Sequence, residues 1–520
     1  MLEASQSIAL RGADRTPIAA DNSGMSLRQS SGSVRPDPQP DAGALRRSDP
    51  ARAGARATTR QAGTFLSRSP AVGSPENFAA LSRAAGEVRA LLRLAVPIML
   101  ISLVNMGMGI TDATMVSAMY GTEAFAAVAV GSDLYSIIFY LGAGIVAGVA
   151  PFYSAAVARN ECLERARLHR SGWLVVSGVA ALTMPIVWTA PNWLALAELD
   201  AELLDAGRGY TRAMALTLVP MLGVALYRTV LTSAERPRLF LYVTLSMLPL
   251  NAAANYIFMA GLAPVPSLGP TGAGVSSLLV ASATLGVLSA IHRRVRKPLP
   301  PGRAWPSRAE VTSVLRVGLP IGIASVGEVG IFLVATLYAA RLGAGDVAAH
   351  TLTLRAAGFA YAIPAALLQA SLVRMARAES VADRATTRAV AAGSVGLSLA
   401  AGIFLCLTLA LAASPLAAAF FDTTPTGAAA ASLATGLLLL LAVLELFGTP
   451  GSAATGLLRG QKDARAPMTY SLFGQWVVGA PVGVLLCEVG GLGVTGLWLG
   501  LVTGTAVASL LTIRRLTASR

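Results

Sequence analysis

Four acidic residues lie within long apolar segments of the chain, and each is a candidate for chemistry. They are Asp112, Asp133, Glu328 and Glu445. A charge at the centre of a bilayer costs about 2.5–3.5 kcal/mol, so an acid there calls for a function or a partner. Because apolar surroundings disfavour the charged form, each carboxyl is a candidate proton carrier, whereas a neighbouring cation would favour the ionised form. A passive, hydrated position near the end of its helix is the alternative for Asp112.

Two prolines precede two of these acids. Pro97 lies 15 residues before Asp112, and Pro320 lies eight residues before Glu328. A proline inside a helix removes a backbone hydrogen bond and bends the helix. We therefore predict Pro97 and Pro320 as helix-bending positions beside two ion-coupling acids.

Amide and hydroxyl side chains offer a second set of candidate ligands. Asn251 and Asn255 lie one helical turn apart, and Ser276 and Ser277 follow in the next apolar segment. Their oxygens suit a hard cation such as sodium. We therefore include Asn251, Asn255 and Ser277 in the coupling site, with Na+ binding at Asp112 and Asn251 as one hypothesis. Hydrogen bonds between helices are the alternative role of such residues.

A gate between the halves of the chain is a further hypothesis. An offset of 222 residues relates Asp133 to Arg355. If the halves are pseudo-symmetric, these two side chains face each other and can form an ion pair. Alternatively, each reaches the membrane surface along its own helix.

The composition requires that these residues be positioned by membrane-spanning helices. The chain has 520 residues, of which 54% are apolar and 13% charged, whereas soluble domains carry roughly 25% charged residues. Spans need about 20 mostly apolar residues. We predict an all-α integral membrane protein with about twelve spans near 93–119, 123–155, 171–190, 207–233, 239–261, 271–291, 313–342, 346–373, 387–412, 428–456, 467–487 and 492–513.

The charges of the connections indicate an orientation. Arginine and lysine follow the even-numbered helices, as at Arg165, Arg236, Arg293, Arg374, Arg459 and Arg514. The intervening connections hold acids or no charge, as at Glu123, Glu202 and Asp422. Since basic residues mark the cytoplasmic side, we predict that both termini are cytoplasmic.

An internal repeat divides the chain. Residues 91–97 recur at 314–320, and residues 268–272 recur at 492–496, with offsets of 223 and 224. Two matches at nearly one offset indicate a duplicated six-helix unit, in which substrate binds between halves that alternate access. The predicted organisation is listed from the N-terminus: a disordered basic cytoplasmic tail (1–74), an N-lobe of helices 1–6 (75–295), a basic cytoplasmic linker (296–312) and a C-lobe of helices 7–12 (313–520).

Several function classes find no support. The formal charge of +14 lies mainly in the tail and in alternate connections, so nucleic acid is not an expected partner. The three cysteines and three histidines form no metal-ligand pattern. A primary pump would need a phosphate-binding loop of the type G-x-x-x-x-G-K-[ST], which the sequence lacks. We predict no cofactor and no enzymatic activity; a passive channel stays open.

At this point the chain resembles the multidrug and toxic compound extrusion (MATE) family over about residues 90–515. The resemblance rests on segments 92–97 with 112–116, on 318–322 with Glu328, on 348–350 and on 458–463. It implies a V-shaped, cation-coupled exporter with two six-helix lobes. It also implies that Asp112 binds a proton or sodium while Pro97 bends the helix, and that Asn251 belongs to the cation site.

The chain departs from the family pattern at two positions. Asn255 stands where the family often has an acid, and Gly448 stands where one bacterial subgroup, to whose helix 7 acid Glu328 corresponds, has another. Glu445 lies three residues before Gly448 on nearly the same helix face, and could substitute. Fewer carboxylates favour protons over sodium as the coupling ion.

We therefore predict a monomeric, multi-pass exporter of the bacterial inner membrane that exchanges a proton or sodium for small amphipathic, cationic compounds. The expected partners are this small-molecule substrate and the lipid bilayer. The cationic cargo is expected because charges within the spans are mostly acidic. A lipid-linked saccharide flippase of related fold is the nearest alternative, and an integral-membrane enzyme is the alternative from another class.

Overall fold

The computed structural model describes residues 75–196, 201–295 and 305–518. They belong to one compact unit that covers residues 70–520. The tail predicted at 1–74 and the middle of the predicted linker lie outside the described residues.

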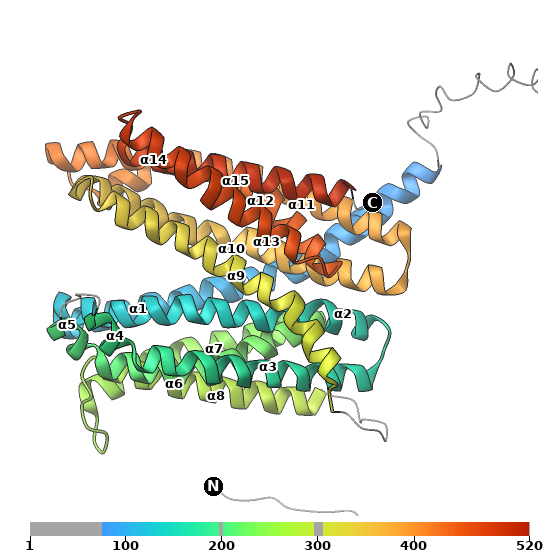
Figure 1. The fold of residues 1–520 in the computed structure, drawn as a ribbon, viewed down its shortest axis with the longest axis horizontal. Coiled ribbons are helices and arrows are strands. Elements are labelled where there is room, and N and C mark those ends of the chain that lie inside the picture. The colour runs from blue at the N-terminus through green and yellow to red at the C-terminus, as the bar shows by residue number, and fades with distance from the viewer. Residues whose placement is uncertain (1–74, 197–200, 296–304, 519–520) are drawn as a thin grey trace, which may run out of the picture. The chain divides into compact units, whose positions relative to one another are not determined.

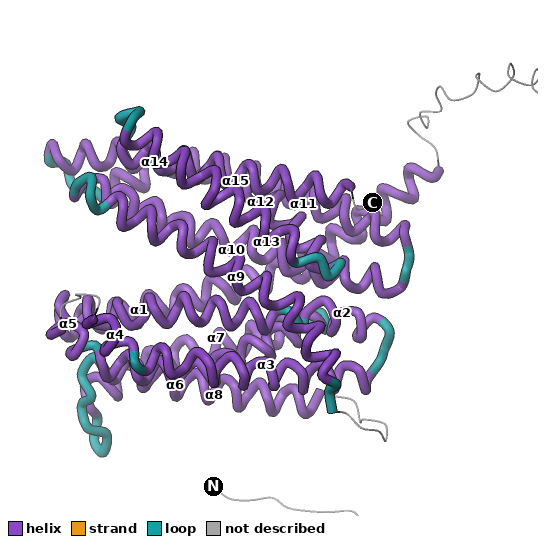
Figure 2. Tube along the Cα trace, viewed as in Figure 1, coloured by secondary structure: helices purple, strands orange, loops and turns teal. Residues whose placement is uncertain are grey.

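Helices joined by short connections make up the described chain, with no strand among the residues described (Figure 2). In order they are α1 (Pro75–Ala147), α2 (Ala150–Ala158), α3 (Cys162–Trp188), α4 (Ala190–Leu196), α5 (Ala201–Ala206), α6 (Arg208–Ser233), α7 (Pro237–Tyr256), the π-helix η1 (Ile257–Gly261), α8 (Thr271–Val295), α9 (Arg308–Ala339), α10 (Ala344–Val381), α11 (Arg384–Phe420), α12 (Pro425–Gly460), α13 (Arg465–Leu472), the π-helix η2 (Phe473–Gly479), α14 (Ala480–Glu488) and α15 (Gly493–Ala518).

Twelve helical segments in the described chain are long and apolar enough to cross a membrane, which confirms the predicted number. Helix α1 holds the first span and most of the second, because its backbone leaves the helical region at Gly121 (φ 81°, ψ −176°). Positive φ favours glycine, which has no Cβ to clash. The second span continues through α2 to Ala158.

Several helices extend further into the basic connections than the sequence analysis predicted. Helix α3 begins at Cys162 rather than near 171, and α10 continues to Val381 rather than ending near 373. Helix α9 begins at Arg308, inside the predicted linker. The Ser307 side chain accepts a hydrogen bond from the Glu310 N–H, and the Glu310 carboxylate accepts one from the Ser307 N–H. Such a capping box satisfies two backbone donors and fixes the helix start.

The helices of each repeat gather into a bundle of their own (Figure 1). We call α1–α8 the N-terminal bundle and α9–α15 the C-terminal bundle. The first helix of each, however, begins against the other. The start of α1 packs on α10 and α11, and the start of α9 packs on α3 and on a core shared with α6. The two bundles are therefore joined through the crossings of α1 and α9.

Glycines bring the second span and α9 into direct backbone contact. A Cβ on Gly144 would lie 2.6 Å from the Gly322 Cα, and one on Gly318 would lie 2.1 Å from the Ile145 carbonyl oxygen. A Cβ on Gly148 would lie 2.5 Å from the Val314 carbonyl oxygen. Small residues four apart on facing helices allow this close approach in lipid.

The variant Gly318→Ala tests the crossing. Because the added methyl group meets backbone rather than a movable side chain, we expect a loss of about 1–3 kcal/mol in stability, measured as a lower thermal unfolding midpoint in detergent. The matched control is Gly286→Ala in α8, where a Cβ meets nothing within 4 Å. Equal midpoints for the two variants would contradict the crossing.

Candidate functional site

Asp112 is bonded to a neighbouring helix in the N-terminal bundle. The Asn255 side-chain amide of α7 donates a hydrogen bond of 2.5 Å to Oδ1 of Asp112 in α1. Asn251, one turn earlier on α7, lies within hydrogen-bond reach of the same carboxylate. Asn251 and Asn255 are buried, with 2% and 0% of their surface exposed. The structure thus brings together three of the residues that the sequence analysis assigned to the coupling site.

The same three residues provide oxygen atoms for a cation. The amide Oδ1 atoms of Asn251 and Asn255 are buried and have no hydrogen-bond partner among the described residues. Buried acceptors without a partner are uncommon and call for an explanation. A carboxylate with two amide oxygens is a donor set for a hard cation. The residues therefore fit either sodium or, on the carboxyl group alone, a proton.

Tyr210 of α6 adds a side chain that the sequence analysis did not identify. It is 6% exposed, and its hydroxyl lies within hydrogen-bond reach of Ser132. Asp112 and Asp133 are both close enough to interact with it electrostatically. A tyrosine in a span carries no distinguishing pattern, because only the helix it faces makes it part of a site.

Glu328 has a corresponding environment in the C-terminal bundle. The Ser471 hydroxyl of α13 donates a hydrogen bond of 3.0 Å to Glu328 Oε1 in α9. Arg459 of α12 interacts electrostatically with Glu328. Arg459 is 7% exposed, and its Nε has no partner among the described residues. The sequence analysis counted Arg459 among the basic connections, but α12 continues to Gly460 and carries it inside the bundle.

The two acids occupy equivalent helix pairs at different depths. Asp112 and Asn255 are 143 residues apart, and so are Glu328 and Ser471. The π-helices η1 and η2 begin two residues after Asn255 and Ser471 respectively. The second pair follows the first by 216 residues, whereas the prolines repeat after 223. Glu328 therefore lies seven residues, or roughly 10 Å along a helix, closer to its proline than Asp112 does.

Glu445 is buried but has a local partner. It is 4% exposed, and the Thr449 hydroxyl, one turn later on α12, donates a hydrogen bond of 3.0 Å to its carboxylate. Tyr361 of α10 is close enough to interact electrostatically with both Glu328 and Glu445. Glu445 is thus near the Glu328 site without a direct hydrogen bond to Glu328 among the described residues.

Some predicted site residues are not brought together. Ser277 is half-buried, and no hydrogen bond joins it to Asp112 among the residues described. Asp133 and Arg355 are both exposed, and the described part of the chain has no ion pair between them. Their pairing therefore stays a prediction.

Pro97 and Pro320 lie buried inside α1 and α9. Their bending of the helices as the coupling acids change state also stays a prediction.

The expectation that charges within the spans are mostly acidic is wrong. The fourth span carries Arg212 and Arg228, and the tenth carries Arg459. The sequence analysis placed charges by connection and overlooked basic residues inside helices. The cargo's charge therefore cannot be argued from the acids alone.

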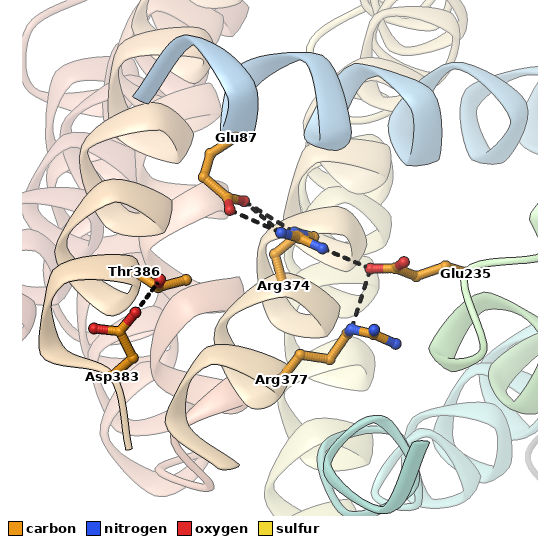
Figure 3. Close-up of polar contacts among 6 residues, drawn as sticks. All are labelled: Glu87, Glu235, Arg374, Arg377, Asp383 and Thr386. Atoms are coloured by element: carbon orange, nitrogen blue, oxygen red, sulfur yellow. Dashed lines mark hydrogen bonds and ion pairs between the residues drawn. The ribbon is translucent and has the colours of Figure 1, made fainter. Parts of the chain in front are cut away.

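An ion cluster joins the bundles at the end that carries the basic connections (Figure 3). Arg374 of α10 donates to both carboxylate oxygens of Glu87 in α1, at 2.7–3.0 Å. It also donates to Glu235 at 2.8 Å, and Arg377 Nε lies 3.3 Å from the same Glu235 oxygen. Bidentate arginine–carboxylate pairs are among the stronger polar contacts. This cluster, rather than Asp133 with Arg355, ties the two bundles in this structure.

A helix cap lies beside the cluster (Figure 3). The Thr386 hydroxyl and the Ala385 N–H donate to the Asp383 carboxylate and hold the pKa of Asp383 below its usual value. Asp383 therefore stays ionised at neutral pH and caps the start of α11.

Comparison with known proteins places the chain. The MatE family model matches residues 97–257 and 320–485, and these matches begin at the two prolines. A probable multidrug resistance protein NorM of Mesorhizobium japonicum is 30% identical over 82% of this chain and 93% of its own length. The corresponding protein of Deinococcus radiodurans is 30% identical over 82% of this chain and 95% of its own length.

Solved structures share the fold. A MOP superfamily transporter from Pyrococcus furiosus aligns with a TM-score of 0.75 at 17% identity, over 83% of this chain and 96% of that one. The eukaryotic MATE transporter AtDTX14 aligns with a TM-score of 0.72 at 15% identity, over 84% of this chain and 97% of that one. With twelve spans and both halves matched by the family model, the chain is a multi-pass membrane transporter, not an enzyme, and it belongs to the MatE family, the multidrug and toxic compound extrusion transporters.

Proposed function

We propose that this protein is a secondary active exporter that exchanges a cation for small amphipathic organic compounds across the bacterial inner membrane. The proposed coupling ion is a proton, which binds at Asp112. The observation that carries this proposal is the Asp112 carboxylate, bonded to Asn255 beside two unpaired amide oxygens. Proteins named as multidrug resistance proteins share about 30% of the sequence over nearly the whole helical region, which supports this class of cargo.

The choice of a proton follows from the charges near Asp112. Asn251 and Asn255 add oxygens but no charge, so Asp112 supplies the negative charge of the set. Protonation neutralises that charge without further ligands, whereas sodium would need the amide oxygens of both asparagines. The sodium hypothesis is the second outcome of the experiment below.

Glu328 is the proposed second coupling residue. Its place on the equivalent helix pair and its bond to Ser471 parallel those of Asp112. Arg459 gives it a positive neighbour that Asp112 does not have. We propose that Glu445 supports this site through Tyr361.

The Arg374 cluster is proposed as a cytoplasmic gate, closed in this structure. It links α10 to α1 and to the connection before α7. In alternating access, the bundles separate at the cytoplasmic end when the opposite end closes, and these ion pairs then break. The basic residues around the cluster support a cytoplasmic location for this end and for both termini. We propose that the exporter works as a monomer.

A flippase for lipid-linked saccharides is the second candidate function. The buried Arg212, Arg228 and Arg459 are the observation that favours it, since cationic residues suit a pyrophosphate-linked cargo. It differs from the first proposal in the cargo that the purified protein moves.

Substituting Asp112→Asn removes the charge and keeps the shape of the side chain. Loss of one charge-assisted interaction costs about 1.5–3 kcal/mol, so we expect gradient-driven ethidium transport to fall roughly tenfold or more. The measurement is ethidium transport in proteoliposomes, with pH and sodium gradients imposed separately. The matched control is Glu123→Gln, an exposed acid at the start of the second span.

The outcomes of this experiment separate the alternatives. Transport driven by the pH gradient supports a proton, and transport driven only by sodium supports the cation site at Asp112 and Asn251. Unchanged transport in Asp112→Asn would overturn the site. Well-reconstituted protein that moves no ethidium, but moves a fluorescent lipid-linked saccharide, would favour the flippase.

Substituting Arg374→Gln tests the gate. Because Glu87 and Glu235 then lose their shared partner, we expect the cytoplasmic end to open more often. The reporter is Ala366→Cys, a position 1% exposed in the core between α1 and α10, in a protein whose three native cysteines are replaced by serine. Its alkylation rate should rise several-fold in Arg374→Gln and stay unchanged in Arg384→Gln, which removes an exposed arginine outside the cluster. Equal rates in the two variants would count against a gate.

A further inference from the structure

A basic pocket lies within the N-terminal bundle, away from the site described above. It has a volume of ≈ 310 Å³, near the lower limit of about 300 Å³ for ligand pockets. The residues that give it its polar character are Tyr153, Arg165, His169, Arg170, Arg236 and His292. They come from the end of α2, the first turns of α3, the N-cap of α7 and the last turn of α8.

The lining carries positive charge without a matching acid. No aspartate or glutamate is among the residues that line the pocket. The three nearest acids in sequence have other neighbours: Glu161 pairs with Arg159, Glu235 pairs with Arg374, and Glu164 lies beside Arg167. Within the described chain, no carboxylate lies in ion-pair distance of Arg165, Arg170 or Arg236. The pocket therefore has an unbalanced positive charge.

The side chains around the pocket are held in place. His169 and His292 stack with ring centroids 4.5 Å apart, and Tyr227 packs against both at 5.4 and 5.5 Å. Arg165 donates to the Cys162 sulfur, a weak acceptor, at 2.9 Å. A preformed wall of aromatic rings and guanidinium groups costs little ordering on binding.

Two helix N-termini add to the positive potential. Helix α3 begins at Cys162 and α7 at Pro237, and neither N-cap residue makes a side-chain hydrogen bond to the helix start. Cys162 and Arg236 line the pocket, so both helix starts lie at its edge. Uncapped N–H groups and the helix dipole favour an anion.

The surroundings indicate the depth of the pocket in the membrane. The Arg170 guanidinium lies 5.5 Å from the centre of the Trp305 ring, and Trp305 is 65% exposed. Tryptophan is enriched at the level of the lipid headgroups. A basic pocket between helices at this level has the chemistry that recognises a phosphate-bearing headgroup.

We propose that this pocket binds the phosphate group of an anionic ligand, with Arg165 and Arg236 as its principal contacts. A glycerophospholipid headgroup and a soluble phosphate compound present the same group to these arginines. The proposal concerns binding and does not require that the protein export any particular compound, so it can fail or succeed independently of the transport proposal.

The test measures binding to the full-length protein in detergent by native mass spectrometry. The probes are dioctanoyl phosphatidylglycerol, dioctanoylglycerol, which lacks the phosphate, and inorganic phosphate. We expect phosphatidylglycerol to bind and dioctanoylglycerol not to bind. Arg165→Gln/Arg236→Gln should weaken phosphatidylglycerol binding roughly tenfold or more, because two charge-assisted contacts are lost.

The matched control is Arg293→Gln/Arg294→Gln, which removes the same charge from exposed positions next to His292. It should change binding less than about twofold, since exposed charges contribute little. Phosphate that competes with the lipid, or binds alone with arginine dependence, would support the same site and identify a soluble ligand as its source. Equal weakening in the two double variants, or no binding of either phosphate probe to wild-type protein with an unchanged thermal midpoint, would overturn the proposal.

Discussion

The structure depends on two helices that cross from one bundle to the other. In lipid, apolar helices gain no hydrophobic energy from association, so close packing must hold them together. Gly144 and Gly148 of the second span meet Gly318 and Gly322 of α9 at backbone distance. In the pseudo-symmetric crossing, Ala95 of the first span packs in one core with Ala366 and Ala370 of α10. Because α1 and α9 each begin against the opposite bundle, any movement of one bundle changes both crossings, and the Arg374 cluster lies beside them.

Within each bundle, the same constraint decides how acids are accommodated. A buried carboxylate needs a partner, and each acid on the first helix of a repeat finds one on the fifth: Asn255 for Asp112 and Ser471 for Glu328. The duplication preserved the 143-residue spacing and shifted the pair by two helical turns relative to the proline. It also provided different neighbours, two amide oxygens on one side and Arg459 on the other. The repeats therefore share an architecture and differ in the chemistry of their sites.

Arginines at the basic end of the molecule have three different environments. Arg374 forms ion pairs with two carboxylates, Arg459 is buried beside Glu328, and Arg165 and Arg236 line a pocket without acids. In the sequence, all four belong to one pattern of basic connections that indicates orientation. Arginine's long side chain and five donors make each environment accessible from a helix end. Their roles differ because different helices lie next to them.

The sequence alone determined the number of spans, the duplication and the candidate acids, since these follow from hydrophobic length, spacing and the cost of charge in lipid. It also paired Asp112 with Asn251 and Asn255 as one site, through residue chemistry and a family resemblance. The 143-residue spacing of that pair, applied to Glu328, would have identified Ser471. Only the tertiary structure decided that Arg459 is buried, that Arg374 rather than Arg355 contacts an acid of the other bundle, and that Ser277 is not bonded to Asp112. These contacts depend on the rotation of each helix about its axis and on which helix it faces, and neither is set by hydropathy, because all sides of a span are apolar.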